Sequence, residues 1–343
     1  MAKVGAANMR EVAAAAGVSH ITVSRVLRND PRVAAATRER VLAKGRELGY
    51  AANPLVSAYA AHIRRRTGEA PACNLAWLTA TPEHHAAGYF PWVRPYLEGA
   101  RARAAAQGFP LATDIETHGA RMETVERILR ARGIRGIIVP NIHYYGPELT
   151  ASPHWAAVSL GNSAGGKPIH TVRPNAFENV RIAFDHLLAT GRQRIGFCEN
   201  RYMAVQGRGL HEGGYLYQQR RLNTRDRLPP LTDLHVEPRR AECLERFRKW
   251  YERHRPEAIL TTFFQVADWL RELGLRVPRD VALTHLAIAE ENSPMAGVNV
   301  GARELGSAAV DLLAAHILRN EYGPPANPKH MSITGYWQDG RTV

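Results

Sequence analysis

Cysteines are scarce in this 343-residue sequence, and no run of about 18 apolar residues occurs in it. Cys73, Cys198 and Cys243 are odd in number, lie far apart and form no C-x-x-C pair. They therefore favour neither a disulfide framework nor a structural zinc site. The N-terminus also lacks the charged-then-apolar pattern of a secretory signal. We expect a globular protein of the cytoplasm that holds no metal.

Positive charge is concentrated at the start of the chain. Residues 1–66 hold 12 lysines and arginines against four acids, which places +8 of the total formal charge of +13 there. A basic head on a nearly balanced body favours a polyanion partner, because counterion release dominates nucleic-acid affinity. A solvated basic face without a partner is the alternative. The length suits a small module followed by a body of two lobes.

The first 27 residues predict two short helices joined by a tight turn. Asn8 and Glu11 have the spacing of a capping box at the start of the first helix. Gly17 can end this helix in the left-handed conformation, and Ser19 can cap the next helix through its hydroxyl group. Two helices joined in this way form a helix-turn-helix, whose second helix fits the major groove of DNA.

A third helix is predicted over residues 35–48, ending at Gly49, although Ala34 is a poor cap for its start. Helical spacing separates an apolar face from polar and basic residues in both later helices. The residues expected to face the core of the head are Val23, Val26, Leu27, Val41, Leu42 and Leu48.

Several segments of the head occur in a familiar order. They are Val12-Ala13, Ala16-Gly17-Val18-Ser19, Thr22-Val23-Ser24-Arg25-Val26-Leu27, Thr37-Arg38-Glu39-Arg40-Val41 and Leu48-Gly49-Tyr50 followed by Asn53-Pro54. Together they resemble the lac repressor family of bacterial transcription regulators over residues 9–56. The resemblance implies a transcriptional repressor that binds DNA sequence-specifically and is not an enzyme. Since one helix-turn-helix reads only a few base pairs, it also implies a homodimer on a pseudo-palindromic operator.

The same resemblance assigns roles within the second helix. His20, Ile21 and Arg25 would face base edges, and phosphates would be held by Ser19, Thr22, Ser24 and Arg28. Ile21 has no hydrogen-bonding group, so its alternatives are contact with a thymine methyl group and simple packing. For His20 the alternative is an ordinary surface histidine.

Residues 53–61 resemble the hinge helix of the family, which begins here at Asn53, folds on DNA and wedges an apolar side chain into the minor groove. Tyr59 stands where the family has leucine, so its identity as the wedge is open. A linker helix packed on the body is the alternative. We expect a helix-turn-helix domain over residues 1–52, a hinge and linker over 53–71, and an effector-binding and dimerisation domain over 72–343.

The remainder of the chain alternates short apolar strands with amphipathic helices. Strands are predicted at 75–78, 111–115, 137–139, 195–197, 258–260 and 281–286, and helices at 95–107, 122–132, 176–188 and 239–254. This alternation predicts parallel sheets with ligands at the carboxyl ends of the strands. We expect an α/β body of two Rossmann-like lobes, which resembles the effector-binding body of the family and the periplasmic sugar-binding proteins.

The body departs from that resemblance at the positions where sugar-binding members carry charged groups. Gly161-Asn162, His211, Phe263-Phe264 and Ala287-Ile288 stand there instead. These replacements weaken the case for a sugar effector and favour an aromatic-lined or vestigial pocket. The candidate lining residues, for which an ordinary core position is the alternative, are Trp92, Tyr144, Tyr145, Asn162, Arg208, His211, Phe263, Phe264 and His285.

Enzymatic patterns are present but lack their context. Residues 161–165 match G-x-S-x-G after an apolar segment, yet Gly166 and Pro168 disfavour the helix that a nucleophilic serine needs next. Gly207-Arg208-Gly209 lacks the third glycine of a dinucleotide fingerprint, because Glu212 occupies its place. We therefore expect neither a hydrolase nor a cofactor.

Overall fold

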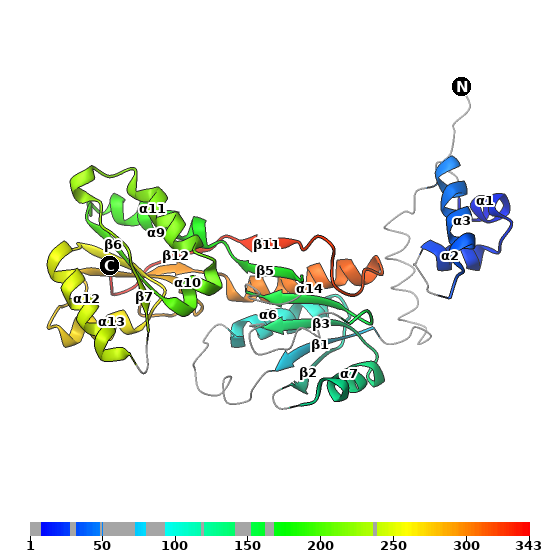
Figure 1. Ribbon diagram of the computed structural model, residues 1–343, viewed down its shortest axis with the longest axis horizontal. Coiled ribbons are helices and arrows are strands. Elements are labelled where there is room, and N and C mark those ends of the chain that lie inside the picture. Colours follow the sequence, from blue (N-terminus) through cyan, green and yellow to red (C-terminus); the bar gives the residue numbers. More distant parts are fainter. Residues whose placement is uncertain are drawn as a thin grey trace, which may run out of the picture. The chain divides into compact units, whose positions relative to one another are not determined.

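The computed structural model describes residues 8–27, 32–48, 50, 73–79, 93–117, 120–140, 152–161, 168–235 and 239–343. Two compact units are distinguished: an N-terminal head, and a body that comprises Asn74–Ala314 and Tyr322–Val343 (Figure 1). Some predicted site residues lie outside the described residues: Arg28, Asn53, Tyr59, Trp92, Tyr144, Tyr145 and Asn162.

The head contains α1 (Met9–Ala16), α2 (His20–Leu27) and α3 (Ala35–Glu47). The predicted capping box is present, since Glu11 N donates to Asn8 Oδ1 at 3.1 Å and Asn8 N donates to a Glu11 carboxylate oxygen at 2.8 Å. Gly17 ends α1 with φ of 63° in the left-handed region. Thr22 N then donates to Ser19 Oγ at 3.1 Å, which caps α2 as predicted.

The core of the head is narrower than the sequence predicts. It consists of Val12, Ala13, Ala16, Val23, Val26 and Val41. Leu27, Leu42 and Leu48 are exposed, so their predicted burial is wrong. In α3, Val41 and Gly45 face the core four residues apart, and Leu42 therefore points about 100° away from it. Leu27 and Leu48 lie at the ends of their helices, beyond the reach of this small core.

The first lobe of the body is built on a six-stranded, wholly parallel sheet in the order β11-β5-β4-β3-β1-β2. Its strands are β1 (Asn74–Thr79), β2 (Leu111–Glu116), β3 (Ile134–Pro140), β4 (Ala156–Leu160), β5 (His170–Pro174) and β11 (His330–Ile333). The second lobe has the order β12-β10-β9-β8-β6-β7, in which β12 runs antiparallel. Its strands are β6 (Ile195–Asn200), β7 (Leu231–Leu234), β8 (Ala258–Thr261), β9 (Ala282–Ile288), β10 (Gly297–Asn299) and β12 (Tyr336–Gln338).

Helices cover both faces of each sheet (Figure 1). The first lobe has α6 (Val93–Ala106), α7 (Met122–Ala131) and α14 (Ala302–Leu318). The second has α9 (Ala176–Ala189), α10 (Arg201–Gly207), α11 (Leu210–Gln219), α12 (Arg240–His254) and α13 (Gln265–Glu272), with a 3-10 turn at Thr224–Asp226. Two-sided cover explains why the strands read as short apolar runs. The predicted fold class, a helical head with a two-lobed α/β body, is confirmed.

Glycines permit the closest approach of two helices in the first lobe. A Cβ atom at Gly99 would lie 1.9 Å from Arg303 O, and one at Gly306 would lie 1.9 Å from Tyr96 O. Helices α6 and α14 therefore pack almost backbone to backbone, and Ser307 Oγ donates to Gly99 O at 3.2 Å across the contact.

The chain crosses between the lobes three times: from β5 to α9, from β10 to α14, and from β11 to β12. Polar contacts tie the crossings together. Gly335 N donates to the buried Asn179 Oδ1 at 3.0 Å, and Asn175 N donates to Ile333 O at 2.8 Å. The two lobes are therefore joined by three crossings that lie close together.

Candidate nucleic-acid interface and effector pocket

Helix α2 has one buried face and one exposed face. Val23 and Val26 are buried against the other helices of the head. The exposed residues are Ser19, His20, Ile21 and Arg25, while Thr22 and Ser24 are half-buried. Ile21 is 52% exposed and takes no part in the core, which argues against the packing alternative for this residue. Every described residue assigned to DNA is therefore at least partly accessible on or just before α2.

Ser19, which is assigned to DNA, and the basic residue Arg40 also stabilise the fold of the head. The Ser19 hydroxyl group caps α2 and lies 2.9 Å from Thr22 Oγ1, so Ser19 has a structural role besides any phosphate contact. Arg40 Nε donates to Ala16 O at 3.1 Å and ties α3 to the end of α1. The positively charged Arg40 thus stabilises the packing of the head.

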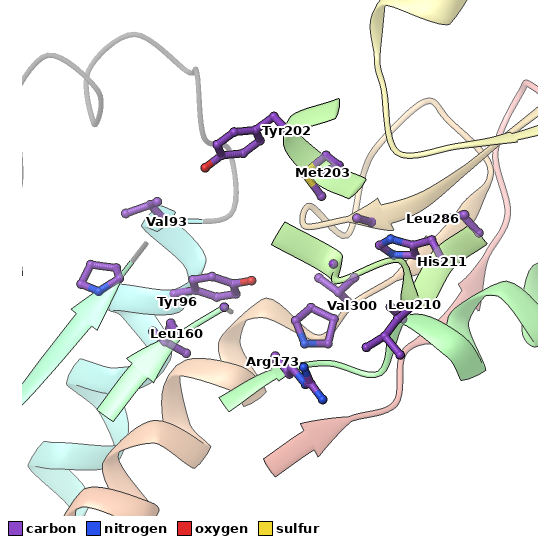
Figure 2. A pocket seen from close by; sticks show the side chains of 16 residues that line it. Val93, Tyr96, Leu160, Arg173, Tyr202, Met203, Leu210, His211, Leu286 and Val300 are labelled. Atoms are coloured by element: carbon purple, nitrogen blue, oxygen red, sulfur yellow. The ribbon is translucent and has the colours of Figure 1, made fainter. Parts of the chain in front are cut away.

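A pocket lies between the lobes of the body, at the carboxyl ends of strands from both sheets (Figure 2). Its cavity volume, counted as the space that the centre of a water molecule can occupy between the described residues, is about 120 Å³. The strand order on each sheet places a topological switch point near these ends, where α/β proteins bind ligands. Its lining consists of Val93, Tyr96, Pro140, Leu160, Gly161, Arg173, Pro174, Ala176, Tyr202, Met203, Gly207, Leu210, His211, Leu286, Ala287 and Val300.

Among the predicted lining residues that the structure describes, His211 borders the pocket. Phe263 instead packs in the hydrophobic core, 5.3 Å from the Trp269 ring centroid, because it points inward where β8 leads into α13. Its neighbour Phe264 is 41% exposed and stacks on His285 with 3.9 Å between ring centroids. Arg208 and His285 lie near the pocket without bordering it. We therefore withdraw Phe263 as a lining residue.

The sequence analysis missed several residues of the pocket wall, among them Tyr96, Tyr202 and Arg173. Helical periodicity marks Tyr96 as one apolar residue among many, and Arg173 lies within β5, a strand that the sequence analysis did not predict. Only the meeting of β5 with α6 and α10 brings them together. The described lining contains no aspartate or glutamate.

A buried polar group lies behind His211. Glu199, at the end of β6, is fully buried, and its Oε1 atom lies 2.9 Å from His211 Nδ1 at an angle unlike that of a hydrogen bond. Thr262 Oγ1 also donates to this oxygen at 3.4 Å. Such a glutamate directly after the apolar run 195–198 was a signal available in the sequence.

His285 completes this region and is held in its neutral form. Its Nδ1 atom accepts a hydrogen bond from Ala287 N at 3.2 Å. Burial, together with the nearby His211, lowers the pKa of His285 to about 3.

Despite these side chains, no group of three or more potential metal ligands occurs in the part of the chain that the structure describes. Within that same part, no helix is both long and apolar enough to cross a membrane.

Two parts of the chain match known families. Residues 8–53 match the family described as bacterial regulatory proteins, lacI family, and residues 184–343 match the periplasmic binding protein-like domain. The HTH-type transcriptional regulator reg1 of Streptomyces lividans is 31% identical over 216 residues, which cover 58% of this chain. The chain spans 55% of the length of that curated relative.

Solved structures share the fold along the chain. A complex of the transcriptional regulator CelR with cellobiose is 20% identical, with a TM-score of 0.57 over 98% of this chain and 100% of that one. The lac repressor dimer bound to operator and the anti-inducer ONPF is also 20% identical, with a TM-score of 0.56 over 98% and 99%. A LacI transcriptional regulator from a Rhodococcus species is 16% identical, with a TM-score of 0.58 over 79% and 97%.

The helix-turn-helix geometry, the paired parallel sheets and the two family matches lead to one conclusion. This chain belongs to the lacI family of bacterial regulatory proteins, a family of DNA-binding transcription regulators and not of enzymes.

Proposed function

We propose that this protein is a cytoplasmic repressor that binds a pseudo-palindromic DNA operator as a homodimer, and that a small molecule in the inter-lobe pocket changes its affinity for DNA. The observation that carries the proposal is the division of α2 into two faces. One face buries Val23 and Val26, and the other exposes His20, Ile21 and Arg25. A helix presented in this way can enter the major groove. The lac repressor, whose fold this chain shares, has been crystallised as a dimer on its operator.

The roles of individual residues follow from their chemistry. Arg25 carries a guanidinium group that matches guanine O6 and N7, His20 can hydrogen-bond a base edge, and Ile21 suits a thymine methyl group. Ser19, Thr22, Ser24 and Arg28 would contact phosphates. For the hinge, Asn53 and Tyr59 stay proposals drawn from the sequence, as do the domain limits 1–52, 53–71 and 72–343.

The pocket supplies a means of control. Because its wall comes from both lobes, a ligand held there interacts differently with open and closed arrangements of the body. A ligand can shift a conformational equilibrium only through such a difference in affinity. The three crossings between the lobes are the segments about which that shift would occur.

Selection of a randomised DNA pool by the full chain tests the proposal. We expect enrichment of a pseudo-palindromic site, and Arg25→Ala should weaken binding to it by about 1–3 kcal/mol and relax the preference at one position in each half-site. Arg28→Ala is the matched comparison within the head and should weaken binding to all sequences alike, since a phosphate contact carries no base information.

Two results would count against these assignments. If no sequence is enriched, the protein is not a sequence-specific regulator. If Arg25→Ala leaves every base preference intact, Arg25 does not read a base, whatever the loss of affinity. Arg121→Ala, an exposed substitution on the body, controls for the loss of one positive charge.

A further inference from the structure

The pocket combines a largely apolar wall with a basic edge. Tyr96, Leu160 and Leu286 belong to the wall, which includes surfaces from both lobes. Arg173 brings a permanent charge to the described lining, in which there is no carboxylate. Figure 2 shows Arg173 at the end of β5, with Leu210 of α11 on the other lobe. A ligand that fits this lining needs an apolar body and a group that a cation can bind.

Further basic groups gather beside Arg173. Strand β11 pairs with β5 so that His330 is opposite Thr171 and Ser332 is opposite Arg173. Side chains alternate along a strand, so His330 lies on the same face of the sheet as Thr171 and Arg173. His330 and Arg173 are offset by two positions along the paired strands. Arg208, which ends α10 with φ of 50°, approaches from the second lobe.

The closeness of these groups affects their pKa values. Burial and the positive charge of Arg208 lower the pKa of Arg173. Burial, followed by the charges of Arg173 and Arg208, lowers the pKa of His330. An anion bound at Arg173 is attracted by each of these positive charges.

Glu199 is fully buried next to His211 and is not part of the described lining. Its Oε1 atom lies close to His211 and Thr262, and its buried Oε2 atom makes no hydrogen bond among the described residues. No carboxylate in the described part of the lining is available to accept the hydroxyl protons of a sugar, while Arg173 offers donors to an anion.

We infer that the pocket binds a small organic monocarboxylate, whose carboxylate pairs with Arg173 and whose apolar body packs on Tyr96, Leu160 and Leu286. A guanidinium group binds a carboxylate through two parallel hydrogen bonds. Because Arg173 belongs to the first lobe and Leu286 to the second, the bound ligand joins the lobes and stabilises one arrangement of them. The assignment rests on the proposed function, since it names the class of effector for the same pocket.

Calorimetric titration of the full chain with matched acids and amides tests the inference. The probes are benzoate, phenylacetate and hexanoate, each compared with its own amide, and cellobiose as a neutral sugar. At least one acid should bind about tenfold or more tightly than its amide, because a charge-assisted pair is lost in the amide. Arg173→Gln should weaken that acid by a similar factor, and Arg173→Lys by less. Arg121→Gln, which removes an exposed charge elsewhere on the body, should change nothing.

The inference is overturned if no acid binds, if an amide or cellobiose binds as tightly as the acids, or if Arg173→Gln leaves acid binding unchanged. Should Arg173→Gln fail to fold, the comparison of acid with amide in the unaltered chain decides. DNA selection on the same preparation separates this result from the proposed function. Enrichment of a site without acid binding overturns the effector class alone, whereas acid binding without enrichment supports the pocket assignment and overturns the regulator.

Discussion

His285 should make the second lobe sensitive to mild acid. The imidazole is 1% exposed, and its burial together with the nearby His211 disfavours its charged form. Its pKa lies near 3 in the folded chain, against 6.5 for an ordinary histidine. Between pH 6.5 and pH 3, His285 is protonated in the unfolded chain but neutral in the folded chain. Stability must therefore fall as the pH is lowered through this window.

The size of the effect follows from the two pKa values. Each unit of pH below 6.5 costs about 1.4 kcal/mol until the folded pKa is approached, so the loss from His285 at pH 5 is about 2 kcal/mol. The ion-paired carboxylates titrate below the range between pH 7 and pH 5. Arg319 lowers the pKa of Glu321 to about 2, and the stability from such a group is lost only as the pH falls below about 4.5.

Urea unfolding of the full chain at pH 7 and at pH 5 measures this loss. His285→Asn keeps an acceptor for Ala287 N but does not titrate, so it should lose about 2 kcal/mol less than the unaltered protein between the two conditions. Burial also lowers the pKa of His186, His254 and His330, so only the difference between the two proteins reports on His285.

The control is His154→Asn, which removes an exposed histidine from the first lobe and leaves the contribution of His285 in place. A general cost of the asparagine substitution appears equally at both pH values and does not affect the comparison. If His285→Asn and the unaltered protein lose the same free energy between pH 7 and pH 5, the imidazole is not held neutral by burial and the reasoning fails.

Two further predictions concern the fold. Asn8→Ala removes the capping box of α1 and should destabilise the head by about 1 kcal/mol, seen as faster amide exchange in α1 of the full chain; unchanged exchange would show that the cap contributes little. Gly306→Ala forces a Cβ atom against Tyr96 O and should cost more than about 3 kcal/mol in urea unfolding, whereas Gly213→Ala, with open space in α11, should cost nothing; equal effects would refute the close helix approach.

The sequence determined the elements whose signals are local. The ends of α1 and the start of α2 depend on Asn8, Glu11, Gly17 and Ser19, each acting within one turn of its own position. The apolar runs of β1, β3 and β8 were equally clear, because strands covered on both faces must be apolar throughout. Family membership followed from the same local patterns in the head.

Elements that depend on a distant partner were not predicted. Strand β11 is largely exposed and has no apolar pattern, and it is a strand because it pairs with β5 more than 150 residues earlier. The core of the head was overestimated for a related reason. Spacing shows which side of a helix Leu42 occupies, but not how far a core of three short helices extends.

The pocket was decided by the tertiary structure. Phe263 and Phe264 are adjacent and alike in the sequence, yet the turn from β8 into α13 buries one in the core and leaves the other on the surface beside His285. Arg173 becomes a lining residue only because the ends of strands from two sheets meet across the crossings. Side-chain direction at such a meeting is set by register and by the crossing of the chain, and neither is encoded within a few neighbouring residues.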